Sequence, residues 1–233
     1  MILKRIFFVL SGFLVINVCA LWAADSASFV DLGFSPDGRT YMFAQYGVRS
    51  GTLRSWADMF IVDVARNNFV SGGRISYTHD RPIVAGQDGS GALYHIIAKN
   101  AALAERHNIV YTNQGQPLYI ALAGDPAFEG STIVFRDFAT DISYRANLVE
   151  TVIGSGRNIQ SSFYITLEGV GRDGRARTFT VGTPHLQRPS IFSYRIKRVL
   201  IDPSGNSLIF VIEMKSHAAD GNDVRYMVEA LRF

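Results

Sequence analysis

The stretch Phe34-Ser35-Pro36-Asp37-Gly38-Arg39 lies between two apolar runs, residues 29–34 and 41–46. Pro36 fixes φ at the second position of a turn, Asp37 can bond back to the backbone, and Gly38 accepts a positive φ. This chemistry between two strand-like runs predicts a tight β-hairpin. A similar stretch, Ile201-Asp202-Pro203-Ser204-Gly205-Asn206, lies between residues 192–201 and 208–212. Hairpins of the same design are therefore predicted near both ends of the chain.

Short apolar runs separated by turn residues fill most of the remaining sequence, which is typical of antiparallel strands. A bulge is predicted where Gly72 and Gly73 interrupt one run. A third hairpin is predicted around Asn113-Gln114-Gly115-Gln116 and a fourth around Gly171-Arg172-Asp173-Gly174-Arg175. Besides the runs quoted above, the predicted strands are residues 58–64, 69–77, 109–111, 118–122, 132–138, 142–149, 163–170, 177–181 and 224–232.

One segment has the periodicity of a helix. Leu93, Ile96 and Ala104 belong to an apolar set that recurs at intervals of three and four residues, so residues 92–106 are predicted to form an amphipathic helix. Asp88 or Ser90 is its predicted N-cap.

The pattern as a whole predicts a mainly β domain. We expect an antiparallel β-sandwich, or a strongly bent double sheet, with one amphipathic helix. A small or degenerate β-propeller is the alternative, because the F-S-P-D-G turn resembles the hairpins of propeller blades. However, the turns begin near residues 36, 113, 172 and 203, which is no constant period. A dozen strands would also make about three four-stranded blades, fewer than the usual minimum.

The first residues have the pattern of a signal peptide. Lys4 and Arg5 precede an apolar run, and Leu21-Trp22-Ala23 offers a cleavage site before Ala24. We expect residues 1–23 to be removed and residues 24–233 to form a single exported domain, periplasmic or secreted. The alternatives are an uncleaved membrane anchor and a lipoprotein attached through Cys19, although Val18 fits a lipobox poorly.

Cleavage changes the charge and the cysteine content of the chain. It removes two of the 23 basic residues and none of the 20 acidic ones, which leaves 21 basic and 20 acidic residues. Such a balance argues against a nucleic-acid partner, and we predict no membrane span after cleavage. Cys19 is also lost, so the mature domain must rely on its core rather than on disulfides.

The glycine-rich residues 86–93 precede the predicted helix, where a phosphate-binding loop would lie. Such a loop requires Lys and a hydroxyl residue where Ala92 and Leu93 stand, and the dinucleotide version requires glycine at Tyr94. We therefore interpret the stretch as a helix-capping loop.

Other catalytic or metal-binding patterns are incomplete. The histidines, at positions 79, 95, 107, 185 and 217, lack a zinc-binding spacing. Ser90 and His95 are one helical turn apart, but Ser71, Ser90 and Ser155 all lie outside a G-x-S-x-G motif. No catalytic, cofactor-binding or metal-binding residue is assigned. The acidic residues closest to a calcium-binding arrangement, none with EF-hand spacing, are Asp58 with Asp63, Asp125 with Glu129, and Asp137 with Asp141.

The densest basic region surrounds the fourth predicted hairpin and the strand that follows it. Arg195 and Lys197 share one face of that strand, because alternate residues of a strand point the same way. The functional interpretation is a surface for an anionic partner, and the structural one is an edge strand protected from aggregation by its charges. The residues of this predicted surface are Arg172, Arg175, Arg177, Arg195 and Lys197.

The chain resembles a family of predicted secreted bacterial proteins whose domain is of unknown function. The matching stretches are Gly33-Phe34-Ser35-Pro36-Asp37-Gly38-Arg39, Phe43-Ala44-Gln45-Tyr46-Gly47, Phe60-Ile61-Val62-Asp63-Val64, Tyr194-Arg195-Ile196-Lys197, Phe210-Val211-Ile212-Glu213 and Gly221-Asn222-Asp223-Val224-Arg225-Tyr226. The resemblance implies export and a β-rich domain, and it implies no catalytic residue. Our main hypothesis is a non-enzymatic domain that binds or scaffolds an unknown partner in the cell envelope, and an anionic partner is one candidate. The alternative is an envelope hydrolase whose site assembles only in the fold.

Overall fold

A computed structural model describes residues 25–122, 130–218 and 221–233, and the predicted signal peptide lies outside these ranges. The strands fall into three antiparallel sheets. The N-terminal sheet contains β1 (Ser28–Phe34), β2 (Thr40–Val48), β3 (Arg54–Asp63) and β4 (Asn68–Pro82). The outer sheet contains β6 (Thr132–Asp137), β7 (Ile142–Ile153), β8 (Gln160–Val170), β9 (Ala176–Val181) and β10 (Arg188–Pro189). The central sheet contains β5 (Gln116–Ile120), β11 (Ile191–Ile201), β12 (Ser207–Ala218) and β13 (Gly221–Arg232).

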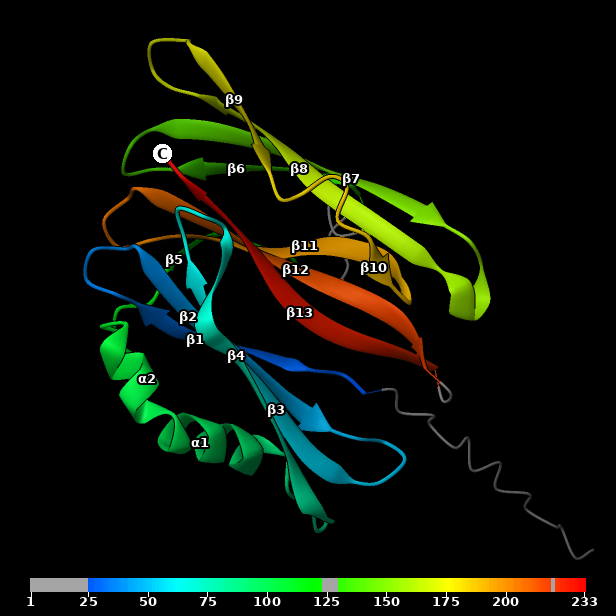
Figure 1. Cartoon of the computed structure of the whole chain (residues 1–233). Coiled ribbons are helices and arrows are strands. Elements are labelled where there is room, and N and C mark those ends of the chain that lie inside the picture. The colour runs from blue at the N-terminus through cyan, green and yellow to red at the C-terminus, as the bar shows by residue number, and fades with distance from the viewer. Residues whose placement is uncertain (1–24, 123–129, 219–220) are drawn as a thin grey trace, which may run out of the picture.

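The sheets stack as layers, with the central sheet between the other two (Figure 1). One apolar core, which includes Phe163 and Phe210, joins the outer and central sheets. A second, which includes Phe43 and Val211, joins the central and N-terminal sheets. Phe210 and Val211 are adjacent on β12, so this strand is buried on both faces. That double burial explains its continuous apolar sequence.

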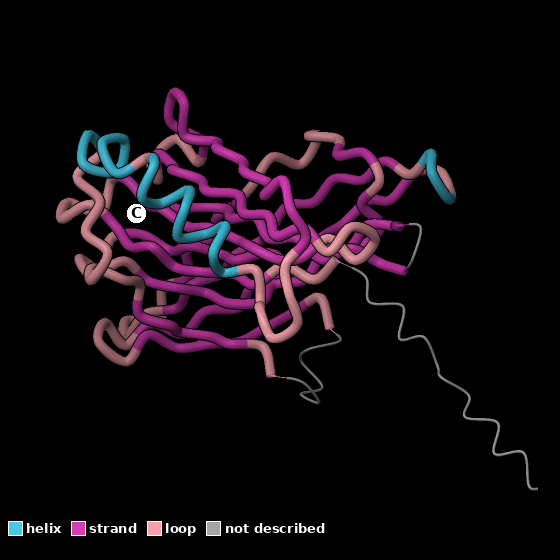
Figure 2. Tube along the Cα trace, turned by 90° about the horizontal axis from the view of Figure 1, so that it is seen from below, coloured by secondary structure: helices cyan, strands magenta, loops and turns pink. Residues whose placement is uncertain are grey.

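Two short helices cover the free face of the N-terminal sheet, as the view from below in Figure 2 shows. They are α1 (Ser90–Lys99) and α2 (Ala101–Arg106), and Ile96 of α1 packs into a third apolar core with β2 and β3. The predicted single helix is therefore divided at Asn100, whose side chain donates a hydrogen bond of 2.7 Å to the Ile96 carbonyl. The N-cap prediction was wrong by one residue, because Gly89 occupies this position with φ +84°.

The two matching turns form as predicted and lie side by side. The Ser35 N–H donates to the Thr40 carbonyl at 2.9 Å, and the Asp202 N–H donates to the Ser207 carbonyl at 3.0 Å. Gly38 has φ +65°, and a Cβ atom there would lie 2.5 Å from Oδ2 of Asp202. Glycine is thus required at position 38 both by the backbone and by the neighbouring turn.

The structure confirms a mainly β, antiparallel sandwich with little helix, and the sheets number three. The propeller alternative does not describe this stack of layers. The bulge at residues 72–73 and the fourth hairpin are confirmed. The third predicted hairpin was wrong: β5 pairs with β11, and Val110 forms only an isolated bridge with Phe34. Within the described residues, no helix is long and apolar enough to cross a membrane.

Candidate functional site

A cleft of about 480 Å³ opens at one end of the sandwich, between the outer and central sheets. We call it the terminal cleft. It is bordered by the ends of three hairpins, β6–β7, β8–β9 and β11–β12, and by Phe233 after β13. Its volume lies within the usual range for small-molecule sites. The loops at the ends of a β-sandwich are also where binding residues are usually found.

Aromatic rings line the inner part of the terminal cleft. Tyr144, Phe179 and Phe233 all contribute to it. The Phe233 ring lies 6.5 Å from that of Tyr144 in a stacked arrangement and 5.6 Å from that of Phe179 edge-on. Phe233 is half exposed, so part of this residue is accessible at the mouth. Burial raises the pKa of the Tyr144 hydroxyl, and the nearby Asp137 carboxylate raises it further.

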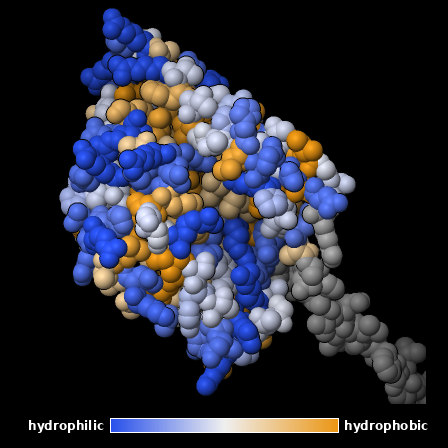
Figure 3. Space-filling model, viewed as in Figure 1, coloured by the Kyte–Doolittle hydropathy of each residue, from blue (hydrophilic) through white to orange (hydrophobic). Residues whose placement is uncertain are grey.

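Three of the predicted arginines form the rim of the terminal cleft. Arg172, Arg175 and Arg177 all line it and are exposed. Arg172 bonds to the carboxylate of Asp141, and Nε of Arg175 lies 3.6 Å from Oδ2 of Asp173. Within the described ranges, Arg177 has no ion pair. Figure 3 shows hydrophobic surface between groups of hydrophilic residues at this end of the molecule.

Glycines keep the terminal cleft open. A Cβ atom at Gly169 would lie 3.0 Å from the Tyr144 ring, so glycine lets this ring lie against β8. Gly205, in the turn between β11 and β12, has no atom within 4 Å of a Cβ position. A larger residue at position 205 would therefore project into free space beside the cleft.

The other two residues of the predicted basic surface lie elsewhere. Arg195 and Lys197 are on β11, where they alternate with Tyr194 and Ile196. Tyr194 and Ile196 belong to the core shared with the outer sheet, so the two basic side chains leave the opposite face of β11. The five predicted residues thus do not form one surface: three gather at the terminal cleft and two do not.

The Ser/His pair of the sequence does not form a catalytic arrangement in the described residues. The Ser90 N–H donates to Oδ1 of Asp88 at 2.9 Å, while the His95 ring stacks on Tyr77 at 4.2 Å. No hydrogen bond joins Ser90 to His95 in the part of the chain that the structure describes. Ser71 and Ser155 lie apart, on β4 and before a 3-10 turn.

The acidic pairs considered for calcium are engaged in other contacts. Asp58 accepts a hydrogen bond from Gln45, and Asp63 lies 3.5 Å from Arg66. Asp137 accepts from the Ala139 N–H at 2.9 Å, which makes it a turn cap. Among the described residues, no three His, Cys, Asp or Glu side chains are placed to hold a metal ion. The pair at positions 125 and 129 lies outside those residues.

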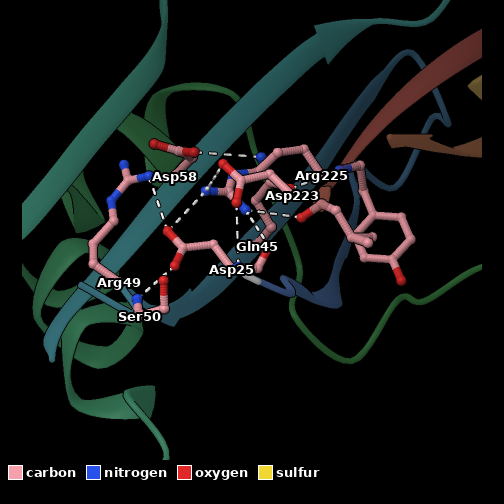
Figure 4. Close-up of polar contacts among 9 residues, drawn as sticks. Asp25, Gln45, Arg49, Ser50, Asp58, Asp223 and Arg225 are labelled. Carbon is pink, nitrogen blue, oxygen red and sulfur yellow. Dashed lines mark hydrogen bonds and ion pairs between the residues drawn. The ribbon is translucent and has the colours of Figure 1, made fainter. Parts of the chain in front are cut away.

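A cluster of charged side chains lies at the opposite end of β13 (Figure 4), and all of them except Arg49 are largely buried. We call it the N-terminal latch, formed by Asp25, Arg49, Arg225 and Trp56. Oδ2 of Asp25 lies 3.2 Å from Nη1 of Arg49 and 3.3 Å from Nη2 of Arg225. Oδ1 of Asp25 accepts a hydrogen bond of 2.6 Å from the Ser50 N–H. The Arg225 guanidinium lies 4.1 Å from the centre of the buried Trp56 ring, a favourable cation–π contact.

The N-terminal latch connects the first described residues to the N-terminal and central sheets. The Val224 N–H donates to the Asp25 carbonyl at 2.9 Å, and the Ala27 N–H donates to the Val224 carbonyl at 3.1 Å. Oδ1 of Asp223 accepts from the Asp25 N–H at 3.2 Å. Burial lowers the pKa of Arg225. Because its charged groups are paired with one another, we interpret the latch as structural.

A second buried carboxylate joins all three sheets. Glu229 on β13 of the central sheet accepts hydrogen bonds from Asn67, in the β3–β4 turn, and from Arg188 on β10 of the outer sheet at 3.3 Å. Burial raises the pKa of Glu229. Asn67 also accepts a bond of 2.7 Å from the Ala230 N–H, so it satisfies both the side chain and the backbone of β13.

Sequence reasoning found the arginines of the terminal cleft and missed its rings. The sequence did contain one indication of a ring near the arginines: Arg177 and Phe179 are two residues apart, so they share a face of their strand. No signal could place Tyr144 and Phe233 together, since they are far apart in sequence and meet only through the packing of two sheets. The N-terminal latch was missed for the same reason.

The structure defines this protein as a mainly β domain, a layered sandwich with a cleft of about 480 Å³ at one end. The chain belongs to the family described as predicted secreted protein (DUF2259), whose model matches residues 42–232. This match confirms the family resemblance, and the family's description as secreted agrees with a periplasmic or secreted location. No curated protein and no solved structure matches the chain.

Proposed function

We propose that this protein is a non-enzymatic binding domain of the bacterial cell envelope. In this proposal residues 1–23 are a signal peptide, and residues 24–233 act in the periplasm or outside the cell. The family's description as secreted and the terminal cleft support it. The domain binds its ligand at the terminal cleft rather than over the whole basic region predicted from sequence.

The single observation that carries this proposal is the composition of the terminal cleft. Aromatic rings form its inner part, and three exposed arginines form its rim. Rings bury apolar surface, and guanidinium groups bind carboxylate or sulfonate oxygens with two parallel hydrogen bonds. The cleft therefore suits a ligand that combines an apolar part with a negative charge.

The proposal is tested with 8-anilinonaphthalene-1-sulfonate, a probe that joins aromatic rings to one sulfonate. Its fluorescence rises when the rings leave water. We expect saturable binding to the purified protein and an affinity about tenfold lower for Arg177→Ala, because a charge-assisted hydrogen bond contributes roughly 1.5–3 kcal/mol.

The matched control is Arg145→Ala. Arg145 is exposed on β7, next to the inward-facing Tyr144 and Ala146, so it lies on the outer face of the same sheet. We expect this variant to bind the probe like the wild type. Equal loss of affinity in both variants, or no loss in either, would count against the terminal cleft as the site.

A further inference from the structure

The polar groups of the terminal cleft narrow the chemistry of its ligand. Besides the arginines, its lining includes Asp137, Asp173 and Thr140. Pockets for long apolar chains are lined predominantly by hydrophobic side chains. An acyl chain here would remove water from the exposed Asp173 carboxylate and from the rim arginines without replacing its hydrogen bonds, which is costly. The ligand must therefore bring hydroxyl or other donor groups of its own.

The charge balance of the cleft limits the charge of the ligand. Arg172 is bonded to Asp141 and Arg175 lies beside Asp173, which leaves Arg177 as the rim arginine without an ion pair in the described residues. A group with two or more charges, such as a phosphate ester, would have one unpaired arginine of the rim to bind it. Among the described residues, no helix N-terminus of the kind that commonly binds phosphate lines the cleft. A ligand with a single carboxylate that binds Arg177 fits this balance of charges.

The half-exposed Phe233 indicates a third property of the ligand, after its donor groups and its charge. It lies at the mouth, supported on one side by Tyr144 and on another by Phe179. A flat ligand face that carries C–H groups can pack on the negative face of such a ring. Asp173 is exposed and, as a carboxylate, only accepts hydrogen bonds, so it suits hydroxyl groups at the edge of that ligand.

We propose that the ligand of the terminal cleft is an acidic sugar, a pyranose ring that carries one carboxylate. Its C–H face packs on Phe233, its carboxylate binds Arg177, and its hydroxyl groups donate to Asp173. The inference rests on the proposed function, because it names the ligand of the same cleft. The sugar is either a free uronic acid or a unit of an acidic polysaccharide.

Titration calorimetry with defined saccharides tests this inference. The probes are galacturonic acid, glucuronic acid, tri-galacturonic acid and a neutral galactose oligomer of the same length, with octanoate and inorganic phosphate as competing chemistries. We expect binding of at least one uronate and none of the neutral oligomer. Tighter binding of the trimer than of the monomer indicates a polysaccharide, and equal binding indicates a free sugar acid.

Substitutions test the proposed carboxylate contact with Arg177 and the proposed ring contact with Phe233 separately. We expect Arg177→Ala and Phe233→Ala each to weaken uronate binding more than tenfold, and Arg145→Ala to leave it unchanged. Urea unfolding of each variant shows that the fold is intact. If octanoate, phosphate or the neutral oligomer binds and no uronate does, the sugar inference is overturned. Arg177-dependent binding of the naphthalene sulfonate would still support the proposed function in that case, and its absence would overturn both.

Discussion

The N-terminal latch and the rim of the terminal cleft contain the same residue types at opposite ends of β13, but they differ in burial. The side chains of Asp25 and Arg225 are 7% and 17% exposed, whereas those of Asp173 and Arg175 are 59% and 86% exposed. Breaking a buried pair leaves a charge without water or partner, while an exposed group regains water at once. The comparison teaches that arginine density in the sequence does not distinguish a structural cluster from a binding surface.

The two ends of the sandwich also differ in what surrounds the charges. Arg225 of the latch lies over a ring that is itself fully packed, so no face of Trp56 is available to a ligand. At the terminal cleft Phe233 is half exposed, whereas Trp56 is 1% exposed. Binding at the cleft and stability at the latch are therefore separable by substitution.

The largest expected effect is on stability at the latch. We expect Asp25→Ala to lower the free energy of unfolding by about 3–5 kcal/mol, because the largely buried Arg225 would keep only Asp223, at 3.7 Å, as an ionic partner and the Ser50 N–H would lose its acceptor. Asp173→Ala, which breaks an exposed pair at the cleft, should cost about 0–1 kcal/mol. Urea unfolding of the purified proteins measures both. Equal losses in the two variants would remove the distinction between the two ends.

An effect of similar size is expected at the two matching turns. Both glycines have positive φ, but only at Gly38 would a Cβ atom meet a neighbour, Asp202. Gly205→Ala should cost about 1–3 kcal/mol from backbone strain alone. Gly38→Ala should exceed that cost by about 1–3 kcal/mol, since overpacking is added to the strain. Urea midpoints that rank the two variants in the reverse order would contradict the contact between the turns.

These turns also show what the sequence could predict. The hairpins at residues 34–40 and 201–207 depend on local turn chemistry, and they form as predicted. The third hairpin failed because β5 pairs with β11, about eighty residues away, and pairing at that distance is set by packing rather than by a turn. Local patterns also placed Arg177 at a hairpin, but they could not show which rings it would meet.

The prediction of a single helix failed for a related reason. Its apolar period continues from Leu93 to Ala104, yet the Asn100 side chain bonds to the carbonyl four residues earlier and ends α1. Short polar side chains compete with helical hydrogen bonds in this way. Local sequence patterns could not predict the N-terminal latch, because Asp25 and Arg225 are 200 residues apart.

The pH dependence of stability should distinguish the buried Glu229 from an exposed glutamate. Burial raises the pKa of Glu229 above its unfolded value. The stability that Glu229 contributes is therefore fully present below the unfolded pKa and is lost as the pH rises through the folded pKa. We expect the stability of the wild type relative to Glu229→Gln to fall as the pH rises above the unfolded pKa of the Glu229 carboxyl, by about 1.4 kcal/mol per unit of pKa difference.

Urea unfolding at a series of pH values measures this difference. Glu168→Gln, at an exposed position of β8, is the matched control and should follow the wild type throughout. Parallel curves for the wild type and Glu229→Gln would show that the Glu229 pKa is not raised in the folded protein.

The smallest effect on stability is expected at Asp141, where the cleft differs most from the latch. Hydrogen bonds from Arg136 and Arg172 lower the pKa of Asp141, yet both arginines are largely exposed. Asp141→Asn should leave the urea midpoint unchanged, because water replaces the lost contacts. It should also free Arg172 and tighten binding of the naphthalene sulfonate several-fold. That gain should shrink at high salt, where exposed charges are screened. A fall in stability as large as that of Asp25→Ala, with no gain in binding, would mean that Asp141 is a structural residue and that the arginines of the rim serve the fold rather than a ligand.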